Sequence, residues 1–342
     1  MTITPFSLQV TDLTNLGQNR AVESFRRLLW AESSRVGIGR NIINVPQCIN
    51  VGDGGIDAYI ENANPIFDEV IPKGTSGFQI KSSNLSPSDC RKELHVDKNL
   101  NQSLQPEIKK ILDAGGTYIL VLFADITSPK ATGQREQAIK DELIQLGYFN
   151  PNVRLYTATQ LIGFIERFPS LVVWFKNDLS QCLSHSSWAE NREIQLPKGF
   201  VFDDERKKLA EEMSNKLRNC KGQCVVFRIT GLSGIGKTRF VYEALSPDDL
   251  KQRVIYVKAD AFRLSSLFTT LQNDLNLSAI VVIDECDLQQ HDEFVRSFST
   301  RGDRLALLTL SYEIGNIPAP SLPLKITKLS QDSMKNILRA EA

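Results

Sequence analysis

One segment constrains the fold of this chain more than any other: Gly231-Leu-Ser-Gly-Ile-Gly-Lys-Thr238. An apolar stretch at 225–230 precedes it. The glycines at 231, 234 and 236 allow the chain after a strand to curl, so that successive backbone N–H groups point inward. A helix that opens at Thr238 adds the positive potential of its N-terminus. The segment therefore predicts a strand, a loop that cradles a polyphosphate, and a helix.

The residues around this loop predict how a nucleoside triphosphate and its magnesium ion bind. Lys237 is expected to reach the β- and γ-phosphates, and the Thr238 hydroxyl to ligate Mg²⁺. Arg239 follows directly and is counted with the nucleotide-binding residues. Farther on, the apolar run 279–283 ends in Asp284 and Glu285. At the C-terminal end of a buried parallel strand, Asp284 can hold Mg²⁺ through water, and Glu285 is positioned to orient and deprotonate the attacking water.

Apolar strand-length runs alternate with helical patterns throughout the second half of the chain. They fall at 225–230, 254–259, 279–283, 305–310 and 324–328, which predicts a parallel sheet with helices on both faces. Because a complete strand lies between the two motifs, this half resembles the additional-strand class of AAA+ and STAND ATPases. The resemblance favours ATP over GTP. It also makes Thr309 and Ser311 candidate sensors of the γ-phosphate, and the candidate arginine fingers are Arg301, Arg304 and Arg339.

Length and composition limit the remaining possibilities. The chain has 342 residues, which is enough for two domains that each bury a core. Lysine plus arginine equals aspartate plus glutamate, 40 each, so any contact with DNA must be a local patch. Neither a membrane-length apolar run nor a signal-peptide pattern is present, and we expect a cytoplasmic protein without membrane contact. The six cysteines are scattered and predict buried or idle thiols, and the three histidines predict no histidine-based hydrolysis.

The first half predicts a second, compact α/β unit. A helix is expected at 18–33, extended stretches at 41–51, 56–61 and 77–82, a helix at 104–114, a strand at 118–123, a helix at 136–146 and a strand at 153–156. The polar stretch that follows suggests a linker. We therefore expect domains at 1–185 and 201–342, joined by a linker at 186–200.

A group of polar residues in this first unit predicts a catalytic site. Asp57 ends Gly52-Asp-Gly-Gly-Ile-Asp57, and Gln79 and Lys81 follow in Gly77-Phe-Gln-Ile-Lys81. Since side chains alternate along a strand, Gln79 and Lys81 share a face, and Asp57 on a neighbouring strand is expected beside them. Asp-Gly-Gly is also ordinary turn chemistry, and a lone Gln-x-Lys is common. Asp53 is then either a turn residue or an auxiliary ligand.

Together with Glu23 in the first helix, these residues resemble the PD-(D/E)xK nuclease superfamily, in particular its Mrr-like branch, whose third motif is QxK. The resemblance implies that Asp57, Gln79, Glu23 and the backbone carbonyl of Ile80 bind Mg²⁺, and that Lys81 positions the attacking water or neutralises developing charge. Gln79 replaces the commoner acid, so we expect weaker metal binding and a larger role for Glu23. Four lysines are candidate phosphate contacts or simply solvated: Lys92, Lys98, Lys109 and Lys110.

An Mrr-like nuclease joined to a STAND-type NTPase resembles the antiviral STAND (AVAST) proteins of bacteria over nearly the whole chain. In that family, C-terminal helical repeats bind a phage portal or terminase protein. ATP-bound subunits then assemble, commonly as tetramers, and the effector cuts double-stranded DNA. An Mrr-like effector implies the portal-sensing type. The sequence lacks the repeats, so we expect either a fragment of a longer protein or a short homologue triggered by another subunit.

Three hypotheses follow from these patterns. The first is a Mg²⁺-dependent DNA endonuclease gated by ATP-driven oligomerisation. The second is a regulatory ATPase whose N-terminal domain binds DNA or a partner without cleaving. A restriction-type enzyme powered by translocation is disfavoured, because helicase motifs are not visible after Glu285.

Overall fold

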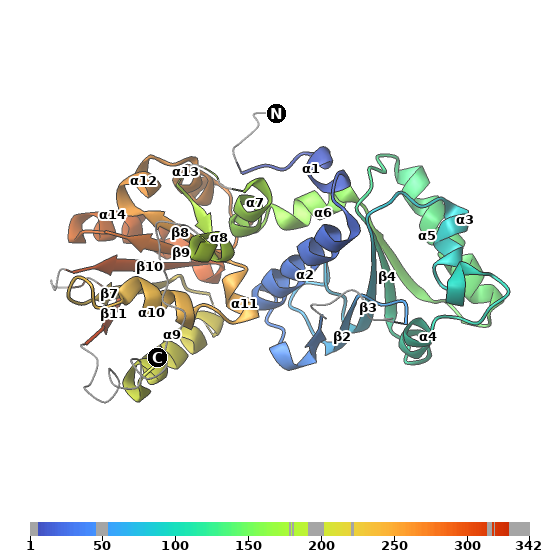
Figure 1. Ribbon diagram of the computed structural model, residues 1–342, viewed down its shortest axis with the longest axis horizontal. Helices are drawn as coiled ribbons and strands as arrows, with labels where there is room; N and C mark the ends of the chain where they lie inside the picture. Colours follow the sequence, from blue (N-terminus) through green and yellow to red (C-terminus); the bar gives the residue numbers. More distant parts are fainter. Residues whose placement is uncertain are drawn as a thin grey trace, which may run out of the picture. The chain divides into compact units, whose positions relative to one another are not determined.

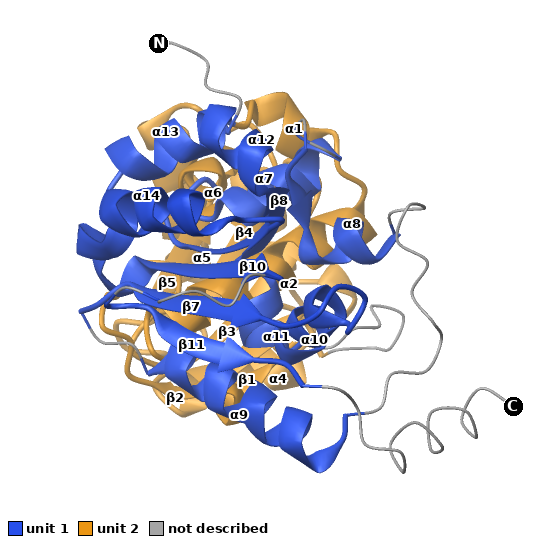
Figure 2. Ribbon diagram, turned by 90° about the vertical axis from the view of Figure 1, so that its left-hand side faces the viewer, with its two compact units in different colours: residues 1–7, 166–342 blue, residues 8–165 orange. Residues whose placement is uncertain are grey.

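The computed structural model describes residues 6–45, 54–177, 179, 181–190, 202–219, 222–312, 317 and 319–327. The chain divides into two compact units, each with its own sheet (Figure 2). Unit 2 comprises residues 8–165, and unit 1 comprises residues 1–7 and 166–342. Both sheets are mixed but rich in parallel pairs, so the chain has the α/β architecture that its sequence predicts.

Unit 2 is built on a five-stranded sheet in the order β1-β2-β3-β4-β5. The first three strands pair antiparallel, and β3, β4 and β5 pair parallel. The strands are β1 Ile43–Asn44, β2 Ala58–Ala63, β3 Gly74–Lys81, β4 Thr117–Leu122 and β5 Asn152–Tyr156. An extended stretch was predicted at 41–51. Strand β1 forms part of it, and residues 46–51 lie outside the described residues.

Helices cover both faces of this sheet (Figure 1). They are α1 Val10–Thr14, α2 Gln18–Arg35, α3 Pro87–Lys92, α4 Pro106–Asp113, α5 Pro129–Gln145 and α6 Ala158–Ile165. Helix α2 forms as predicted, because its apolar residues recur at helical spacing and are buried, and Phe25 packs on Phe78 of β3 with ring centroids 5.3 Å apart. The opposite face carries Tyr118, Leu120 and Leu122 of β4, which pack with apolar residues of α3, α4 and α5.

Unit 1 contains a six-stranded sheet in the order β11-β7-β10-β9-β8-β6. Strands β7 Val225–Thr230, β8 Val254–Lys258, β9 Ala279–Asp284, β10 Leu305–Ser311 and β11 Leu322–Lys325 run parallel, and the short edge strand β6 Leu183–Ser184 pairs antiparallel with β8. Strand β10 lies between β7 and β9. The loop after β7 and the carboxylates at the end of β9 are therefore separated by one strand.

The helices of unit 1 flank this sheet on both sides (Figure 1). They are α7 Pro169–Lys176, α8 His185–Glu190, α9 Asp204–Arg218, α10 Lys237–Ala244, α11 Asp248–Lys251, α12 Ala259–Leu264, α13 Ser266–Asn273 and α14 Leu288–Phe298. Helices α9 and α10 share a core with one face of the sheet. On the other side, Phe262, Phe268, Phe294 and Phe298 of α12, α13 and α14 form an aromatic cluster.

The division between the units differs from the predicted domain boundary. It falls between Ile165 and Glu166 rather than at 185. Residues 186–190, predicted as linker, form most of α8, whose Trp188 is buried and stacks on Tyr242 and Tyr256. Most residues of this stretch are polar, but the large aromatic side chain of Trp188 anchors it in the core. The rest of the predicted linker, 191–200, lies outside the described residues.

None of the helices that the structure describes combines the length and the hydropathy needed to cross a membrane.

Candidate functional sites

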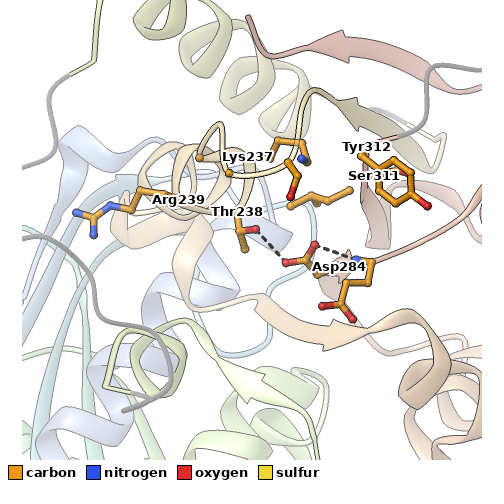
Figure 3. A pocket seen from close by; sticks show the side chains of 11 residues that line it. Lys237, Thr238, Arg239, Asp284, Ser311 and Tyr312 are labelled. Atoms are coloured by element: carbon orange, nitrogen blue, oxygen red, sulfur yellow. Dashed lines mark hydrogen bonds between the residues drawn. The ribbon is translucent and has the colours of Figure 1, made fainter. Parts of the chain in front are cut away.

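The loop between β7 and α10 borders a pocket at the C-terminal ends of the parallel strands. Its volume is about 360 Å³, within the usual range for small-molecule sites. The lining residues come from the loop and α10 and from the ends of β9 and β10: Ser233, Gly234, Gly236, Lys237, Thr238, Arg239, Asp284, Glu285, Leu310, Ser311 and Tyr312. Figure 3 shows Lys237, Thr238 and Asp284 at this pocket. The two sequence motifs thus meet at one place.

The three glycines of the loop serve two different geometric needs. Gly234 and Gly236 have φ of +73° and +88°, in the left-handed region that favours glycine. Gly231 does not, and it is small for another reason. A Cβ built on it would lie 2.8 Å from the backbone oxygen of Ile326, which follows β11. The backbone N–H of Ile326 also donates to Thr230 O at 2.8 Å, so this segment passes directly against the start of the loop.

Lys237 and Thr238 are already directed by hydrogen bonds. Lys237 Nζ donates to the carbonyl oxygens of Gly231 and Leu232, at 3.0 Å each. Burial lowers the pKa of Lys237, and the charge of Asp284 opposes this shift. Thr238 Oγ1 donates to Asp284 Oδ2 at 2.9 Å. A hydroxyl and a carboxylate oxygen in contact are suitable hard donors for Mg²⁺.

Glu285 occupies an unusual backbone conformation beside Asp284. Its φ is +54°, a region that costs energy for a residue other than glycine, and its N–H donates to Asp284 Oδ1 at 2.8 Å. Its side chain is 67% exposed and pairs with Lys258 at 3.0 Å. Glu285 lines the pocket as predicted, but its carboxylate is engaged by a surface lysine in this conformation.

Arg239 lines the pocket but points away from Asp284 (Figure 3). Its guanidinium pairs with Glu243 at 2.5 Å and lies over the ring of Tyr242. Arg301 and Arg304, proposed as fingers, lie in the 3₁₀ segment Ser299–Arg304 and are not among the described lining residues. Arg339 lies outside the described residues.

The two candidate sensors have different environments. Ser311 lines the pocket. Thr309 is fully buried instead: its hydroxyl contacts His291 Nδ1 at 2.8 Å and Arg228 Nη1 at 3.4 Å. Residues 309 and 311 share a side of β10, but only the last one reaches the open end of the sheet. The geometry therefore supports Ser311 and not Thr309.

The second candidate site lies in unit 2, where the last residues of β3 extend beyond Ala58, the first residue of β2. Past the pair Ala58–Phe78, side chains rather than a strand form hydrogen bonds with the backbone at this edge of β3. Asp57 Oδ2 accepts from Ile80 N at 2.6 Å. Gln18 of α2 donates to Ile80 O at 2.7 Å and accepts from Ser82 N at 2.9 Å. Asp57 thus lies beside β3 as predicted, while the predicted carbonyl ligand of Ile80 is held by Gln18.

The side chains of Gln79 and Lys81 point to the face of β3 opposite Phe78. There they contact Glu93, a residue that the sequence did not indicate. Gln79 Nε2 donates to Glu93 Oε2 at 3.1 Å, and Lys81 Nζ lies 3.0 Å from the same oxygen. Tyr118 donates its hydroxyl hydrogen to Gln79 Oε1 at 2.5 Å. Glu93 follows α3 and belongs to no short motif, so sequence spacing gave no signal for it.

Glu23 is not brought to Gln79 and Lys81. Its carboxylate accepts from Arg26 and Arg27 on its own helix, at distances of 2.7–2.9 Å. The physical reason is the alternation of β3: α2 packs on the face of Phe78, and residues 79 and 81 point to the opposite face. The ligand role expected for Glu23 is therefore not supported. Asp53 lies outside the described residues.

The described residues give little support for other metal or thiol chemistry. In the described part of the chain, no group of three His, Cys, Asp or Glu side chains is arranged to hold a metal ion. Four of the described cysteines are buried: Cys90, Cys182, Cys224 and Cys286. Burial raises the pKa of Cys90 to about 11 and that of Cys286 to about 12, so these thiols are inert as predicted. Cys48 and Cys220 lie outside the described residues.

Comparisons with known proteins identify no family. No protein-family model matches the chain, and no curated protein matches it. Among solved structures, the chain is similar to PCH-2 of C. elegans with a TM-score of 0.29 and 13% sequence identity. This match covers 41% of the chain and 48% of PCH-2, about half of that protein's length. Similarity at this level assigns neither a family nor a function.

Proposed function

We propose that unit 1 binds ATP with Mg²⁺ in the pocket beside the 231–238 loop. The observation that supports this most strongly is the meeting of Lys237, Thr238 and Asp284 at the ends of β7 and β9, with β10 between them. That strand order is the arrangement expected for the additional-strand class of P-loop NTPases.

Each residue of the pocket has a role in this proposal. Lys237 exchanges its two carbonyl partners for phosphate oxygens, which are stronger acceptors because they are charged. Thr238 and Asp284 hold the ion, and Ser311 lies where it can contact the terminal phosphate. Glu285 orients water after leaving Lys258. When bound, Mg²⁺ neutralises charge that develops on the phosphates.

We further propose that unit 2 is a Mg²⁺-dependent endonuclease of double-stranded DNA, controlled by ATP-dependent assembly of the chain, as a tetramer, in antiphage defence. The trigger in this proposal is a phage portal or terminase protein. The supporting observation is that Asp57 sits on the backbone of β3 next to Gln79 and Lys81. Carboxylate and amide oxygens fit Mg²⁺, which when bound acidifies water and stabilises charge on phosphate. Lys81 supplies the positive charge that positions this water or balances the phosphate.

A second function is favoured by a specific observation. Lys81 is paired with Glu93, Gln79 is held by Tyr118 and Glu93, and Ile80 O is held by Gln18. Such satisfied groups also suit a regulatory ATPase whose unit 2 binds DNA or a partner without cleaving it.

One experiment separates the two functions. Supercoiled plasmid is incubated with the chain, ATP, Mg²⁺ and candidate phage proteins, and nicking is followed on a gel. The endonuclease proposal expects cleavage that Asp57→Asn and Lys81→Met abolish while ATP binding persists, and that Lys237→Ala abolishes together with ATP binding. Equal cleavage by wild type and both unit 2 variants overturns it, and metal-dependent nicking absent under every trigger favours the regulatory ATPase.

A further inference from the structure

Glu93 is the most completely buried carboxylate near the candidate nuclease residues. Only 2% of it is exposed. Oε2 faces Gln79 Nε2 and Lys81 Nζ, and Oε1 faces Lys98 Nζ at 2.6 Å. One buried carboxylate therefore joins both residues of the predicted QxK pair to one of the lysines considered for phosphate contact.

This placement is costly. Burying a charge in an ion pair carries a desolvation penalty that often exceeds the gain, and a hydrophobic residue of similar size frequently gives equal or better stability. Glu93 also caps the C-terminal end of α3, where the helix dipole disfavours a negative charge. The segment that delivers Lys98 is strained as well, because Asp97 and Lys98 both have φ of +53°. Stability alone gives no reason for such an arrangement.

Glu93 and Asp57 flank Gln79. Ala58 pairs with Phe78 across the antiparallel strands, and Asp57 N donates to Phe78 O at 2.8 Å, so Asp57 lies opposite Gln79 and on the same face of the sheet. The Tyr118 hydroxyl donates to Gln79 Oε1. Since Gln79 Nε2 donates to Glu93, the amide of Gln79 is fixed in orientation from both ends.

We propose that Glu93 supplies the second carboxylate of a divalent-metal site with Asp57, in place of the acid that the strand lacks at Gln79. This inference rests on the proposed endonuclease function. Gln79, whose amide oxygen accepts from Tyr118, is then a positioning residue that orients Glu93 rather than a ligand, and Lys98, whose side chain is 60% exposed, would release Glu93 when a metal ion binds.

Metal binding can be measured without cleavage. The 342-residue chain carrying Asp284→Asn, which removes one of the two carboxylates that line the nucleotide pocket, is titrated with Mn²⁺ in the absence of nucleotide, and free Mn²⁺ is followed by electron paramagnetic resonance. Glu93→Gln and Asp57→Asn are each expected to weaken Mn²⁺ binding roughly tenfold or more. Glu136→Gln is the matched control, since Glu136 also pairs with a lysine, Lys140, and is expected to leave binding unchanged.

An exchange variant separates a metal role from a structural one. Gln79→Glu combined with Glu93→Gln returns the acid to the strand and keeps one amide and one carboxylate in contact. The proposal expects this double variant to recover Mn²⁺ affinity lost in Glu93→Gln, and thermal unfolding checks that all variants are folded. Mn²⁺ affinity unchanged in Glu93→Gln, or not recovered in the exchange, overturns the proposal.

The outcomes for the two proposals are distinguishable. If Asp57→Asn abolishes plasmid cleavage but Glu93→Gln changes neither Mn²⁺ binding nor cleavage, the endonuclease stands and the role of Glu93 fails. If Asp57→Asn cleaves like wild type, the endonuclease itself fails. Loss of both Mn²⁺ binding and cleavage in Glu93→Gln, with recovery of both in the exchange, is the expected result.

Discussion

Thr238 Oγ1 donates a 2.9 Å hydrogen bond to Asp284 Oδ2 and so joins the first turn of α10 to the end of β9. These residues are 46 positions apart, and the strand between them in the sheet, β10, comes from still later in the chain. The bond fixes a hydroxyl and a carboxylate beside each other where a triphosphate-bound metal is proposed to lie.

Removing either partner is expected to weaken ATP binding only when Mg²⁺ is present. Thr238→Ala and Asp284→Asn should lower the affinity for Mg-ATP roughly tenfold, because each loses a ligand or its orientation, while affinity for ATP in EDTA changes little. Lys237→Ala, by contrast, should lose roughly 10- to 100-fold in both conditions, since it removes a charge-assisted phosphate contact. Calorimetric titration with and without EDTA measures this. Equal losses for Thr238→Ala in both buffers would contradict the assignment.

The glycines of the loop are expected to respond differently to alanine. Gly231→Ala puts a Cβ 2.8 Å from the backbone oxygen of Ile326, which cannot move away alone because its N–H is bonded to Thr230 O. We expect a loss of about 1–3 kcal/mol in the free energy of unfolding. Gly234→Ala meets nothing within 4 Å and pays only for its positive φ, about 1 kcal/mol. Urea-induced unfolding compares the two, and a larger loss for Gly234→Ala would refute this explanation.

Gln18 is expected to stabilise the end of β3 more than an ordinary surface glutamine stabilises its helix. Gln18→Ala removes the partners of Ile80 O and Ser82 N, and we expect a loss of about 1–3 kcal/mol. Gln137→Ala is the control, because Gln137 is exposed and bonds only Asp141 on the next turn, so its loss should stay within about 0.5 kcal/mol. Hydrogen exchange at residues 80–82 should rise in Gln18→Ala alone.

Glu23→Gln tests the revised view of the nuclease residues. Because the carboxylate of Glu23 is paired with Arg26 and Arg27, its loss is expected to leave Mn²⁺ affinity unchanged and to cost under about 1 kcal/mol of stability. A tenfold loss of Mn²⁺ affinity in Glu23→Gln would restore the ligand role that the sequence suggests.

The sequence predicted best what local pattern determines. Strands at 225–230 and 118–123 and the helix from Gln18 are recovered nearly to the residue, because apolar periodicity and burial agree there. The position of β10 between β7 and β9 was not assigned, since strand order depends on contacts between distant segments.

In the candidate nuclease site too, local pattern predicted some residues, while contacts between distant segments determined others. Asp57, Gln79 and Lys81 follow from strand alternation alone. The pairing of Glu23 with Arg26 and Arg27 was not predicted, because helical spacing identifies the apolar side of α2 but not the face of the sheet that it covers. Glu93 was missed because its contacts with Gln79 and Lys81 join the end of α3 to β3, which no local sequence pattern indicates.

His291 is expected to make unit 1 sensitive to mild acid. Its ring is buried between the hydroxyls of Thr309 and Ser321, at 2.8 and 2.9 Å, with Arg228 and Asp292 as the charged neighbours. Burial first, and then the charge of Arg228, lowers the pKa of His291 to about 4, from 6.5 in the unfolded chain. A depressed pKa contributes stability that is complete above the unfolded value and is lost as pH falls toward the folded value. At pH 5 the loss relative to pH 7 is about 2 kcal/mol.

His291→Gln should remove that pH dependence, because glutamine can still donate to one hydroxyl and accept from the other but does not titrate. Urea-induced unfolding measures the free energy of unfolding of wild type and variant at pH 7 and pH 5. The drop between the two pH values is then compared between the two proteins. The variant is expected to be less stable than wild type at pH 7 and to have a smaller drop between the two pH values. Parallel drops in both proteins would show that His291 is protonated without cost and would contradict the prediction.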